Sequence, residues 1–412
     1  MRRVVVTGTG SISALGNTMS ELIHSIENRV CGTKKMESWN QYKGLQSLVA
    51  APAELPDVKI IPRKMRRSMG RMSLLANFAA LEALESASIP KETISNNPRF
   101  GCVAGSTMGS AEALNDTFET MLPDHDLTLL KSMGFFKSIS HTVAMNLAQY
   151  FRITGCVIAN SAACASSLQA LGTGFDLIRH NRQDIVLCGG AEELHPTVTG
   201  SFDILFATST KYNQSPEKTP RPFDKNRDGL VCGEGAGILI LEELEHAKKR
   251  GANILAEVIG YNTCGSGDHI SHSDRRAMVQ CMESALADAK IKPSDIDFVN
   301  AHATATLQGD NEEAVAIHTI FGNKTPVNSF KGYLGHTLGA SGSIELSIVI
   351  DMMNNNVIYP TLNLDNVDEA CNMINHVQTK LNRKIDFILK NCFAFGGINA
   401  SIILKKYEGI NE

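Results

Sequence analysis

The stretch that decides the fold reads Val157-Ile158-Ala159-Asn160-Ser161-Ala162-Ala163-Cys164-Ala165-Ser166-Ser167. A short β-branched run predicts a strand over residues 157–159, the small residues predict a tight turn, and the apolar pattern of 166–178 predicts a helix. Cys164 stands where that helix begins, so unpaired N–H groups and the helix dipole are expected to lower the pKa of its thiol. A lone cysteine is also a common small core residue, and this stretch by itself leaves both interpretations open.

The same succession of strand, small-residue turn and apolar helix returns over residues 327–353. Short β-branched runs alternate with helical patterns along the whole chain, which is typical of an α/β fold. The runs predict buried strands at 4–7, 101–104, 157–159, 185–188, 236–241, 296–300, 326–329 and 400–404. The helical patterns predict helices at 74–86, 166–178, 276–289, 311–320 and 343–353.

A charged segment is the best candidate for a seam between two halves: Glu242-Glu243-Leu244-Glu245-His246-Ala247-Lys248-Lys249-Arg250-Gly251. It is predicted to be a helix that ends at its glycine. We therefore divide the chain into an N-terminal half over 1–251, which holds the cysteine turn, and a C-terminal half over 252–412.

Composition excludes several classes of function. The chain has 412 residues, of which 43% are hydrophobic, so it is not disordered. Its 39 basic and 43 acidic residues give a net charge of −4, which argues against a dedicated nucleic-acid binder. No uncharged apolar run approaches the ~20 residues of a membrane span, and the N-terminus lacks the apolar stretch of a signal peptide. Ten cysteines without a C-x-x-C pair fit reduced thiols in a cytoplasm better than a disulfide framework.

Two motifs that suggest a cofactor or a metal fail on one position each. Gly8-Thr9-Gly10-Ser11-Ile12-Ser13 resembles a dinucleotide turn, but a serine occupies the third glycine position. Asp224-Lys225-Asn226-Arg227-Asp228-Gly229 resembles the start of a calcium loop, but its twelfth position is Gly235. Both are interpreted as ordinary turns, and no metal is expected.

Two further segments each place a histidine in a loop of small residues. One is Asn300-Ala301-His302-Ala303-Thr304-Ala305-Thr306, and the other is Gly332-Tyr333-Leu334-Gly335-His336-Thr337-Leu338-Gly339-Ala340. Each follows a predicted strand and precedes a predicted helix. A single histidine is most often a surface or core residue, but two such loops and the cysteine turn together indicate a nucleophile with two donors.

These segments make the chain resemble the condensing enzymes of thiolase fold, specifically the β-ketoacyl-acyl-carrier-protein synthases with a Cys-His-His site. The resemblance extends over nearly the whole chain and includes Arg221-Pro222-Phe223-Asp224 and Phe393-Ala394-Phe395-Gly396-Gly397. Glu192-Glu193-Leu194 and Ser209-Thr210-Lys211-Tyr212-Asn213 make it most similar to synthase I. It implies a duplicated αβαβα five-layer architecture and a cytoplasmic acyltransferase without a cofactor, whose substrates are carried on the phosphopantetheine of an acyl carrier protein.

The resemblance also implies a reaction and its catalytic residues. Malonyl carrier protein would undergo a decarboxylative Claisen condensation with an acyl group on the enzyme, which gives a β-ketoacyl chain two carbons longer. Cys164 would accept the acyl group, and His302 and His336 would serve the decarboxylation. Lys331 and Glu345 match the supporting charged pair of the family.

Further residues are expected at the substrate. Thr304 and Thr306 match threonines that touch the pantetheine arm, and Phe395 matches a gating phenylalanine beside an oxyanion-hole amide. Phe393 and Phe202 are expected to line the substrate site. Met108 would act across a dimer interface, where its loop closes the far end of the partner's acyl pocket.

Partners follow from the same resemblance. The run Arg63-Lys64-Met65-Arg66-Arg67, with Arg71 beyond, would bind an acidic carrier protein through Arg63, Lys64 and Arg67; alternatively it is a solvated helix start. The chain is expected to form a homodimer, or a heterodimer with a chain-length-factor-like homologue, and to bind neither nucleic acid nor membrane.

Departures from the family pattern concern the substrate. Ala303, Ala305, Leu307 and Gln308 interrupt one histidine loop, and Ala394 and Ile398 stand where the family has glycine and threonine. These favour a specialised polyene or type II polyketide pathway, such as aryl-polyene synthesis, over housekeeping fatty-acid elongation. Two alternatives to a synthase remain: a degradative thiolase, for which Cys392 is the only candidate second cysteine, and a non-catalytic chain-length-factor-like partner, which would lack the nucleophile.

Overall fold

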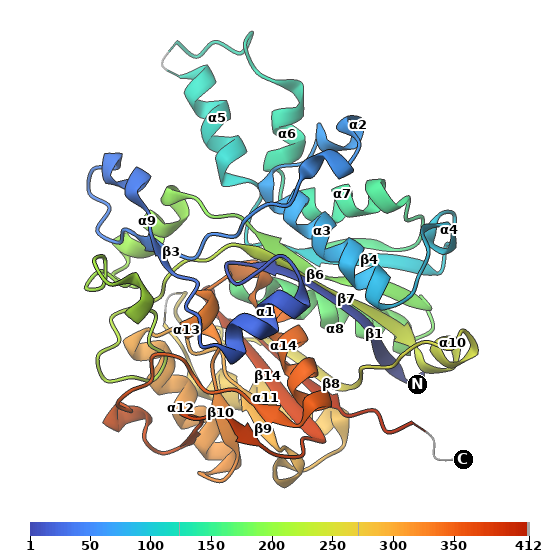
Figure 1. The fold of residues 1–412 in the computed structure, drawn as a ribbon, viewed down its shortest axis with the longest axis vertical. Coiled ribbons are helices and arrows are strands. Elements are labelled where there is room, and N and C mark those ends of the chain that lie inside the picture. Colours follow the sequence, from blue (N-terminus) through green and yellow to red (C-terminus); the bar gives the residue numbers. More distant parts are fainter. Residues whose placement is uncertain (123, 271, 410–412) are drawn as a thin grey trace.

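One mixed sheet crosses the part of the chain that the structure describes, residues 1–122, 124–270 and 272–409 of a computed structural model (Figure 1). Its strand order is β12-β10-β9-β14-β15-β8-β1-β7-β6-β4-β5. The N-terminal part contains β1 (Val4–Ser13), β4 (Phe100–Gly105), β5 (Val157–Asn160), β6 (Ile185–Glu192) and β7 (Gly235–Glu243). The C-terminal part contains β8 (Ala256–Gly265), β9 (Phe298–Asn300), β10 (Pro326–Asn328), β14 (Phe387–Ala394), β15 (Ile398–Lys405) and the edge strand β12 (Asn375–His376).

The two parts repeat one topology. In chain order the strands β1, β4, β5, β6 and β7 lie in the order β5-β4-β6-β7-β1, and β8, β9, β10, β14 and β15 lie in the matching order β10-β9-β14-β15-β8. In both, the last strand is antiparallel to its two neighbours while the remaining pairs are parallel. The duplication expected from the sequence is therefore confirmed. The two parts meet where β1 pairs with β8 over Val4↔Val258, Val5↔Glu257 and Val6↔Ala256.

Helices form three layers around the sheet. On the outer face of the N-terminal strands lie α3 (Arg71–Ser86) and α7 (Thr142–Phe151), and on that of the C-terminal strands lie α11 (Arg275–Ala289) and α12 (Leu307–Phe321). Between the two parts lie α8 (Ser166–Arg179) and α14 (Ser341–Asn355), which touch strands of both (Figure 1). Each layer of helices has its own cluster of buried apolar residues, so the five layers follow from three separate cores.

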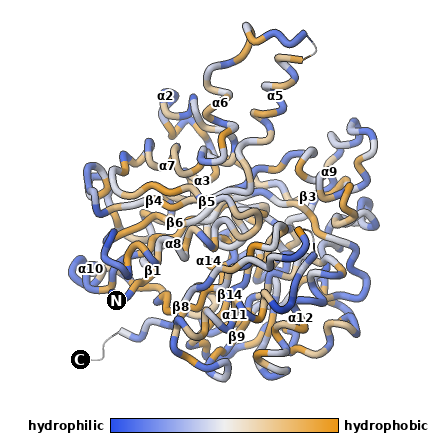
Figure 2. The backbone as a smooth tube through the Cα atoms, turned by 180° about the vertical axis from the view of Figure 1, so that it is seen from behind, coloured by the Kyte–Doolittle hydropathy of each residue, from blue (hydrophilic) through white to orange (hydrophobic). Residues whose placement is uncertain are grey.

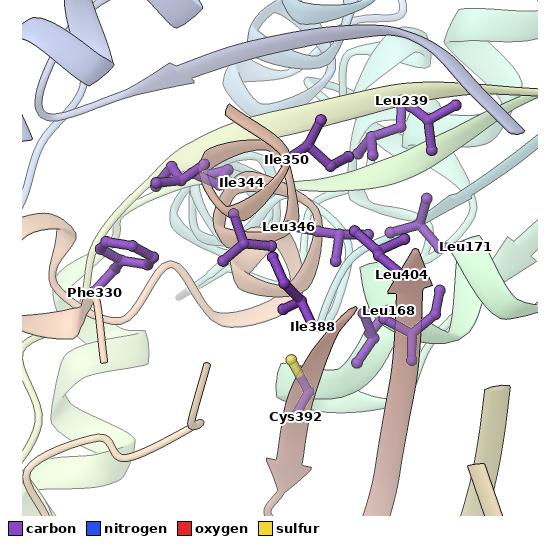
Figure 3. Packing of buried hydrophobic residues seen from close by; sticks show 14 of the residues in the cluster. Leu168, Leu171, Leu239, Phe330, Ile344, Leu346, Ile350, Ile388, Cys392 and Leu404 are labelled. Carbon is purple, nitrogen blue, oxygen red and sulfur yellow. The ribbon is translucent and has the colours of Figure 1, made fainter. Parts of the chain in front are cut away.

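The central layer of helices is built around buried apolar side chains. Leu168 and Leu171 of α8 pack with Ile344, Leu346 and Ile350 of α14 (Figure 3). In the view of Figure 2 the hydrophobic residues gather along the strands, and the peripheral loops are mostly hydrophilic. Among the described residues, no helix combines the length and the apolar character needed to cross a bilayer.

The expectations for residues 157–159 and for the start of the helix at 242–251 were wrong. Strand β5 was predicted to be buried, but it is the edge of the sheet and its residues alternate between exposed and half-buried. Glu242 and Glu243 were predicted to begin a helix, but they end β7, and α10 spans only Leu244–Lys249. The carboxylate of Glu242 accepts a hydrogen bond from Arg250, and that of Glu243 accepts the backbone N–H of His246. These partners offset the cost of burying two acidic side chains at the end of a strand. The division at 251 stays a prediction.

The remaining elements decorate this framework. A hairpin of α5 (Ala111–Met121) and α6 (Ser132–Ser138) projects from it (Figure 1). The other helices are α1 (Met19–Glu27), α2 (Arg63–Arg66), α4 (Lys91–Ile94), α9 (Pro196–Ile204) and α13 (Lys331–Leu334). The short strand pairs are β2 (Lys34–Lys35) with β3 (Val49–Ala50), and β11 (Val357–Ile358) with β13 (Leu381–Asn382).

Gly8 and Gly10 have a packing role. A Cβ added to Gly8 would lie 2.2 Å from the carbonyl oxygen of Ala83, and one added to Gly10 would lie 2.1 Å from that of Ala79. Both carbonyls belong to α3, so the two glycines let this helix lie directly on β1. The interpretation of this segment as an ordinary turn was wrong, because Gly8 to Ser13 lie within β1 and pair with β7.

Candidate active site

Cys164 lies in a tight turn between β5 and α8. The turn η3 (Ala163–Ala165) precedes the helix, and Ala163 has φ +47°, a left-handed conformation that is strained for a residue with a Cβ. Ser166 holds the turn: its Oγ accepts the N–H of Ala162 at 2.9 Å and donates to the carbonyl of Ala163 at 2.7 Å. These hydrogen bonds fix the position of the thiol beyond the C-terminal end of β5. Only 2% of Cys164 is exposed.

The expected activation of this thiol by the helix dipole was wrong for the resting protein. Burial raises the pKa of Cys164 to about 12, and the nearby Cys392 adds to the rise while the charge of Lys331 acts against it. Burial takes the thiolate out of water, which disfavours the charged form. Cys164 therefore stays a neutral thiol until a base accepts its proton.

His336 is positioned as that base. Its Nε2 lies 3.0 Å from Sγ of Cys164. The backbone around it is fixed on both sides, because its N–H donates to the carbonyl of Val231 at 2.7 Å and its carbonyl accepts the N–H of Gly233 at 2.9 Å. Gly335, with φ +67°, makes the turn that brings the histidine back from α13.

His302 faces His336 from the loop after β9. The two rings meet edge to face, with centroids 5.1 Å apart and an interplanar angle of 81°. The carboxylate of Glu313 on α12 holds the loop, since it accepts the N–H of His302 at 2.8 Å and that of Ala303 at 2.7 Å. Burial lowers the pKa of both histidines well below the usual range, and the charge of Lys331 lowers both further. Both imidazoles are therefore neutral, the form that can donate one N–H while accepting at the other nitrogen.

The three side chains expected to act together are thus brought together. One ligating atom from each of Cys164, His302 and His336 lies within 4.8 Å of the others. Such a group could also hold a soft metal ion, but the ammonium charges of two buried lysines oppose a cation there.

Those two lysines share one carboxylate. Glu345 of α14 contacts Nζ of Lys331 with Oε1 and Nζ of Lys390 with Oε2, the latter at 2.5 Å, and the side chains of all three are fully buried. The pair of Lys331 and Glu345 was expected from the sequence, and Lys390 was missed. The available signal was a lysine inside the apolar run of β14, because a charged residue there needs a buried partner.

A cavity of about 350 Å³ opens beside the three side chains. The predicted substrate residues that line it are Thr304, Thr306, Phe393 and Phe395. The hydroxyls of Thr304 and Thr306 lie 3.2 Å apart at its wall. Phe395 contacts Phe202 of α9, with ring centroids 5.6 Å apart, so the proposed gate rests on the residue proposed to line the acyl pocket.

Met108 lies away from this cavity. It follows β4 in a loop at the surface and is 38% exposed. The N–H of its neighbour Thr107 donates to Glu192, which also accepts the N–H of Gly339 in the second histidine loop. A role of Met108 in an acyl pocket therefore needs a second chain.

The basic run divides into two groups. Arg63, Lys64 and Arg67 are exposed at α2, and among the described residues none of them pairs with a carboxylate. Arg71, which the sequence places next to them, instead turns inward and binds Glu234 with two hydrogen bonds of 2.8 and 2.7 Å. Only the first three are available to a partner.

The loop that resembles a calcium site is filled by the protein itself. Asp224 accepts Nε of Arg221 at 3.1 Å and the N–H groups of Asn226, Asp365 and Asn366 at 2.8 to 2.9 Å. Its oxygens are used up by these donors, which agrees with the interpretation of the loop as a structural turn.

Comparison with known proteins points in one direction. The family profiles described as "Beta-ketoacyl synthase, N-terminal domain" and "Beta-ketoacyl synthase, C-terminal domain" match residues 1–247 and 255–365. The 3-oxoacyl-[acyl-carrier-protein] synthase 1 of Haemophilus influenzae is 36% identical over 413 residues, covering 99% of this chain and 100% of the relative. That of Escherichia coli K12 is 34% identical over 409 residues, with the same coverage.

Solved structures agree with these relatives. A β-ketoacyl synthase from Burkholderia phymatum is similar with a TM-score of 0.95 and 40% identity, over 99% of this chain and 100% of that one. A ketosynthase solved with its type II polyketide acyl-carrier protein is similar with a TM-score of 0.90 and 31% identity, again over 99% and 100%.

Proposed function

The chain belongs to the β-ketoacyl synthase family of acyltransferase-class condensing enzymes, and we propose that Cys164, His302 and His336 carry out its condensation. The reaction joins an acyl group to the two-carbon unit of malonyl carrier protein in fatty-acid or polyketide synthesis. Enzymes of this family need no added cofactor, because the phosphopantetheine of the carrier holds the substrates. One observation carries the residue assignment: a buried thiol 3.0 Å from a neutral imidazole, with a second neutral imidazole facing the first.

In the first half-reaction Cys164 takes the acyl group. Sγ attacks the thioester carbonyl as His336 Nε2 accepts the thiol proton, which then passes to the departing sulfur of the carrier. The backbone N–H groups of Cys164 and Phe395 stabilise the oxyanion that forms; one such donor is typically worth about 2.7–4 kcal/mol of barrier. Since the imidazole takes the proton during attack, the high pKa of the free thiol does not prevent the reaction.

In the second half-reaction malonyl carrier protein loses CO₂. The electron pair of the broken C–C bond moves toward the thioester carbonyl, whose oxygen becomes the enolate oxygen. Once Cys164 is acylated its S–H is gone, so Nε2 of His336 can carry an N–H and join His302 in donating to that oxygen. The enolate carbon then attacks the acyl-Cys164 carbonyl, and the thiolate of Cys164 leaves and takes up a proton that the solvent supplies.

The two alternatives find less support. A degradative thiolase needs a second cysteine at the substrate, but Cys392 lies in the apolar core beside Ile388 and is not among the residues that line the cavity (Figure 3). A non-catalytic partner needs no nucleophile, whereas Cys164 is present and paired with a base.

The carrier protein is proposed to bind at α2. Arg63, Lys64 and Arg67 form an exposed basic group without an internal partner among the described residues, which suits an acidic protein. We place the protein in the cytoplasm, where its carrier and its reduced thiols would be found.

A dimer is proposed through the free edge of β5. Val157 on that strand is 43% exposed, Met108 in the loop after β4 is 38% exposed, and the projecting hairpin exposes Phe118 and Phe135. Exposed apolar residues along an unpaired strand edge are typical of a contact surface. The partner is a second copy of this chain or a chain-length-factor-like homologue.

The pathway is proposed to be a specialised polyene or type II polyketide pathway. The departures at Ala303 and Ala394 lie at the cavity, and Ile398 pairs with Ala394 where β14 and β15 meet. Alanine in place of glycine restricts the backbone there. The test is mass spectrometry of the intact protein after incubation with a panel of acyl carrier proteins, followed by malonyl carrier protein. A covalent acyl increment on Cys164 and a released chain two carbons longer support the proposal, and an increment on no member of the panel contradicts it.

A further inference from the structure

Lys390 is a buried cation that the reaction, as described so far, does not use. Its side chain extends from β14 into the central layer, is fully buried, and places Nζ 2.5 Å from Oε2 of Glu345. The carbonyl of Asn391 accepts a second hydrogen bond from Nζ at 2.8 Å. Burying an ammonium group is costly, so its presence beside a charge pair that is already complete calls for an explanation.

A chain of contacts leads from Lys390 to His302. Asn391 follows Lys390 on the strand, and its Nδ2 lies 3.4 Å from Oε1 of Glu313. Ser401 of β15 fixes that amide by donating to its Oδ1 at 2.8 Å. Glu313 in turn accepts the N–H groups of His302 and Ala303. The lysine and the histidine loop are thus linked through one asparagine and one carboxylate.

The charges of this region balance only when Lys390 is counted. Lys331 and Lys390 are two cations, and Glu345 and Glu313 are two carboxyl groups, all of them buried. Burial raises the pKa of Glu313, and the hydrogen bonds from Ala303 and His302 and the charge of Lys390 act against that rise. Without Lys390, Glu313 would have to hold the histidine loop as a less ionised, weaker acceptor.

We propose that Lys390 is a positioning residue of the condensing site: together with Lys331, Glu345 and Glu313 it forms a neutral buried cluster that holds the His302 loop and keeps both imidazoles uncharged. This inference rests on the proposed function of His302 and His336 as N–H donors. A neutral imidazole carries one N–H for the enolate oxygen, whereas a protonated imidazole would be a third positive charge beside the two lysines and would be repelled.

The groups that face the two imidazoles come from several elements. They are Cys164 on η3, Glu313 on α12, Lys331 on α13, Glu345 on α14, and Lys390 and Cys392 on β14. Of these, the two lysines disfavour protonation of the rings and the carboxylates favour it. Removing Lys390 should therefore raise the pKa of His302 and His336, and removing the charge of Glu313 should lower it.

The test compares Lys390→Met, Glu313→Gln and the double variant, each in the Cys164→Ala background so that the thiol does not titrate. Decarboxylation of malonyl carrier protein is measured against pH. In Lys390→Met we expect the acid limb of the pH–rate profile to move to a pH about one unit higher. At a pH on that limb, the rate of decarboxylation should therefore fall about tenfold. Glu313→Gln should move the limb down, and the double variant should lie near the parent. Lys405→Met, the same change at an exposed lysine of β15, is the control.

A second measurement separates positioning from a merely structural effect. With Cys164 intact, acyl transfer to the thiol at neutral pH should change less than about threefold in Lys390→Met, because the imidazoles are neutral there in both proteins. An unshifted limb, or an equal loss in both half-reactions, would overturn the proposal. If Lys390→Met does not fold, comparison of Glu313→Gln with the double variant measures the same shift, since the cluster of the double variant is balanced.

Failure of the proposed function would look different. A parent protein that neither accepts acyl groups nor decarboxylates would contradict the function of the site but leave the cluster untested by activity. NMR titration of the His302 and His336 ring protons, assigned with His→Ala variants, then tests Lys390 directly. Equal midpoints in the parent and Lys390→Met would overturn the inference.

Discussion

At Cys164 burial and a hydrogen-bond acceptor act on the same proton. Burial raises the pKa of the thiol to about 12, so the resting site holds almost no thiolate. His336, 3.0 Å away, can take the proton only as the sulfur forms its new bond. In its proposed role as the nucleophile, Cys164 would therefore be inert until a thioester reaches it, and so protected from adventitious oxidants and alkylating agents.

The reactivity of Cys164 toward small thiol reagents should therefore be low and rise with pH. Because the thiolate is the reactive form, alkylation should accelerate about tenfold per pH unit between pH 7 and 11. Cys264 is the internal comparison: a hydrogen bond from Cys281 lowers its pKa below the usual range of a thiol, and it is half-buried. Peptide mapping after brief iodoacetamide treatment at pH 7.5 should find Cys264 labelled before Cys164. The reverse order would show that Cys164 is ionised in the resting protein.

Substitution at the site should separate the two half-reactions. Cys164→Ala should abolish acyl transfer, yet still decarboxylate malonyl carrier protein, because His302 and His336 remain. His302→Ala should accept acyl groups and lose about a hundredfold to a thousandfold in decarboxylation, the usual effect of removing one oxyanion donor. Acylation is followed by intact mass and decarboxylation by release of CO₂. Normal elongation by Cys164→Ala would contradict the assignment of the nucleophile.

At the scale of elements, the exposed basic residues of α2 differ in role from Arg71, which follows them in the sequence. Arg71 belongs to α3 and is bound to the buried Glu234, so it serves the fold. The short α2 ends before it and leaves Arg63, Lys64 and Arg67 exposed. A basic surface of this kind acts through long-range attraction, which speeds encounter and weakens with salt.

Reversing charge on α2 should weaken binding of the carrier protein without touching the chemistry. Lys64→Glu with Arg67→Glu is expected to lower carrier affinity about tenfold at low salt and less at high salt. Lys248→Glu with Lys249→Glu makes the same change of charge on α10, far from α2 (Figure 1), and should have little effect. Affinity is measured by surface plasmon resonance at two salt concentrations. Equal affinities of the two double variants would remove α2 as the docking site.

At the scale of the whole molecule, the free edge of β5 connects assembly with product length. The sheet ends there with Val157 exposed on β5, and Met108 is exposed in the loop that follows the neighbouring strand β4. Val157→Lys should dissociate the proposed dimer, because it places a charge in an apolar contact, and native mass spectrometry reports the result. A dimer that withstands this change would place the interface elsewhere.

Substitution of Met108 tests which chain completes the acyl pocket. In a homodimer Met108→Ala should lengthen the accepted chains and Met108→Trp should shorten them, with transfer of the shortest acyl groups nearly unchanged. In a heterodimer the controlling residue belongs to the partner, and both substitutions should leave product length alone. Product lengths are measured beside the subunit composition of the assembly. A change in product length in a proven heterodimer would contradict this assignment.

The sequence by itself predicted the fold class and the duplication, and it singled out Cys164, His302 and His336, which the structure brings together. Strand, turn and helix over 157–178 and the loops around His302 and His336 are recognisable because periodicity and turn chemistry are local properties. Only the tertiary structure decided what depends on surroundings. Burial by α14 and β14 raised the pKa of Cys164, which its local position at a helix start could not reveal. Lys390 meets Glu345, forty-five residues away in sequence, because β14 packs against α14. Charge and desolvation depend on distant neighbours, and only the packed chain brings those neighbours together.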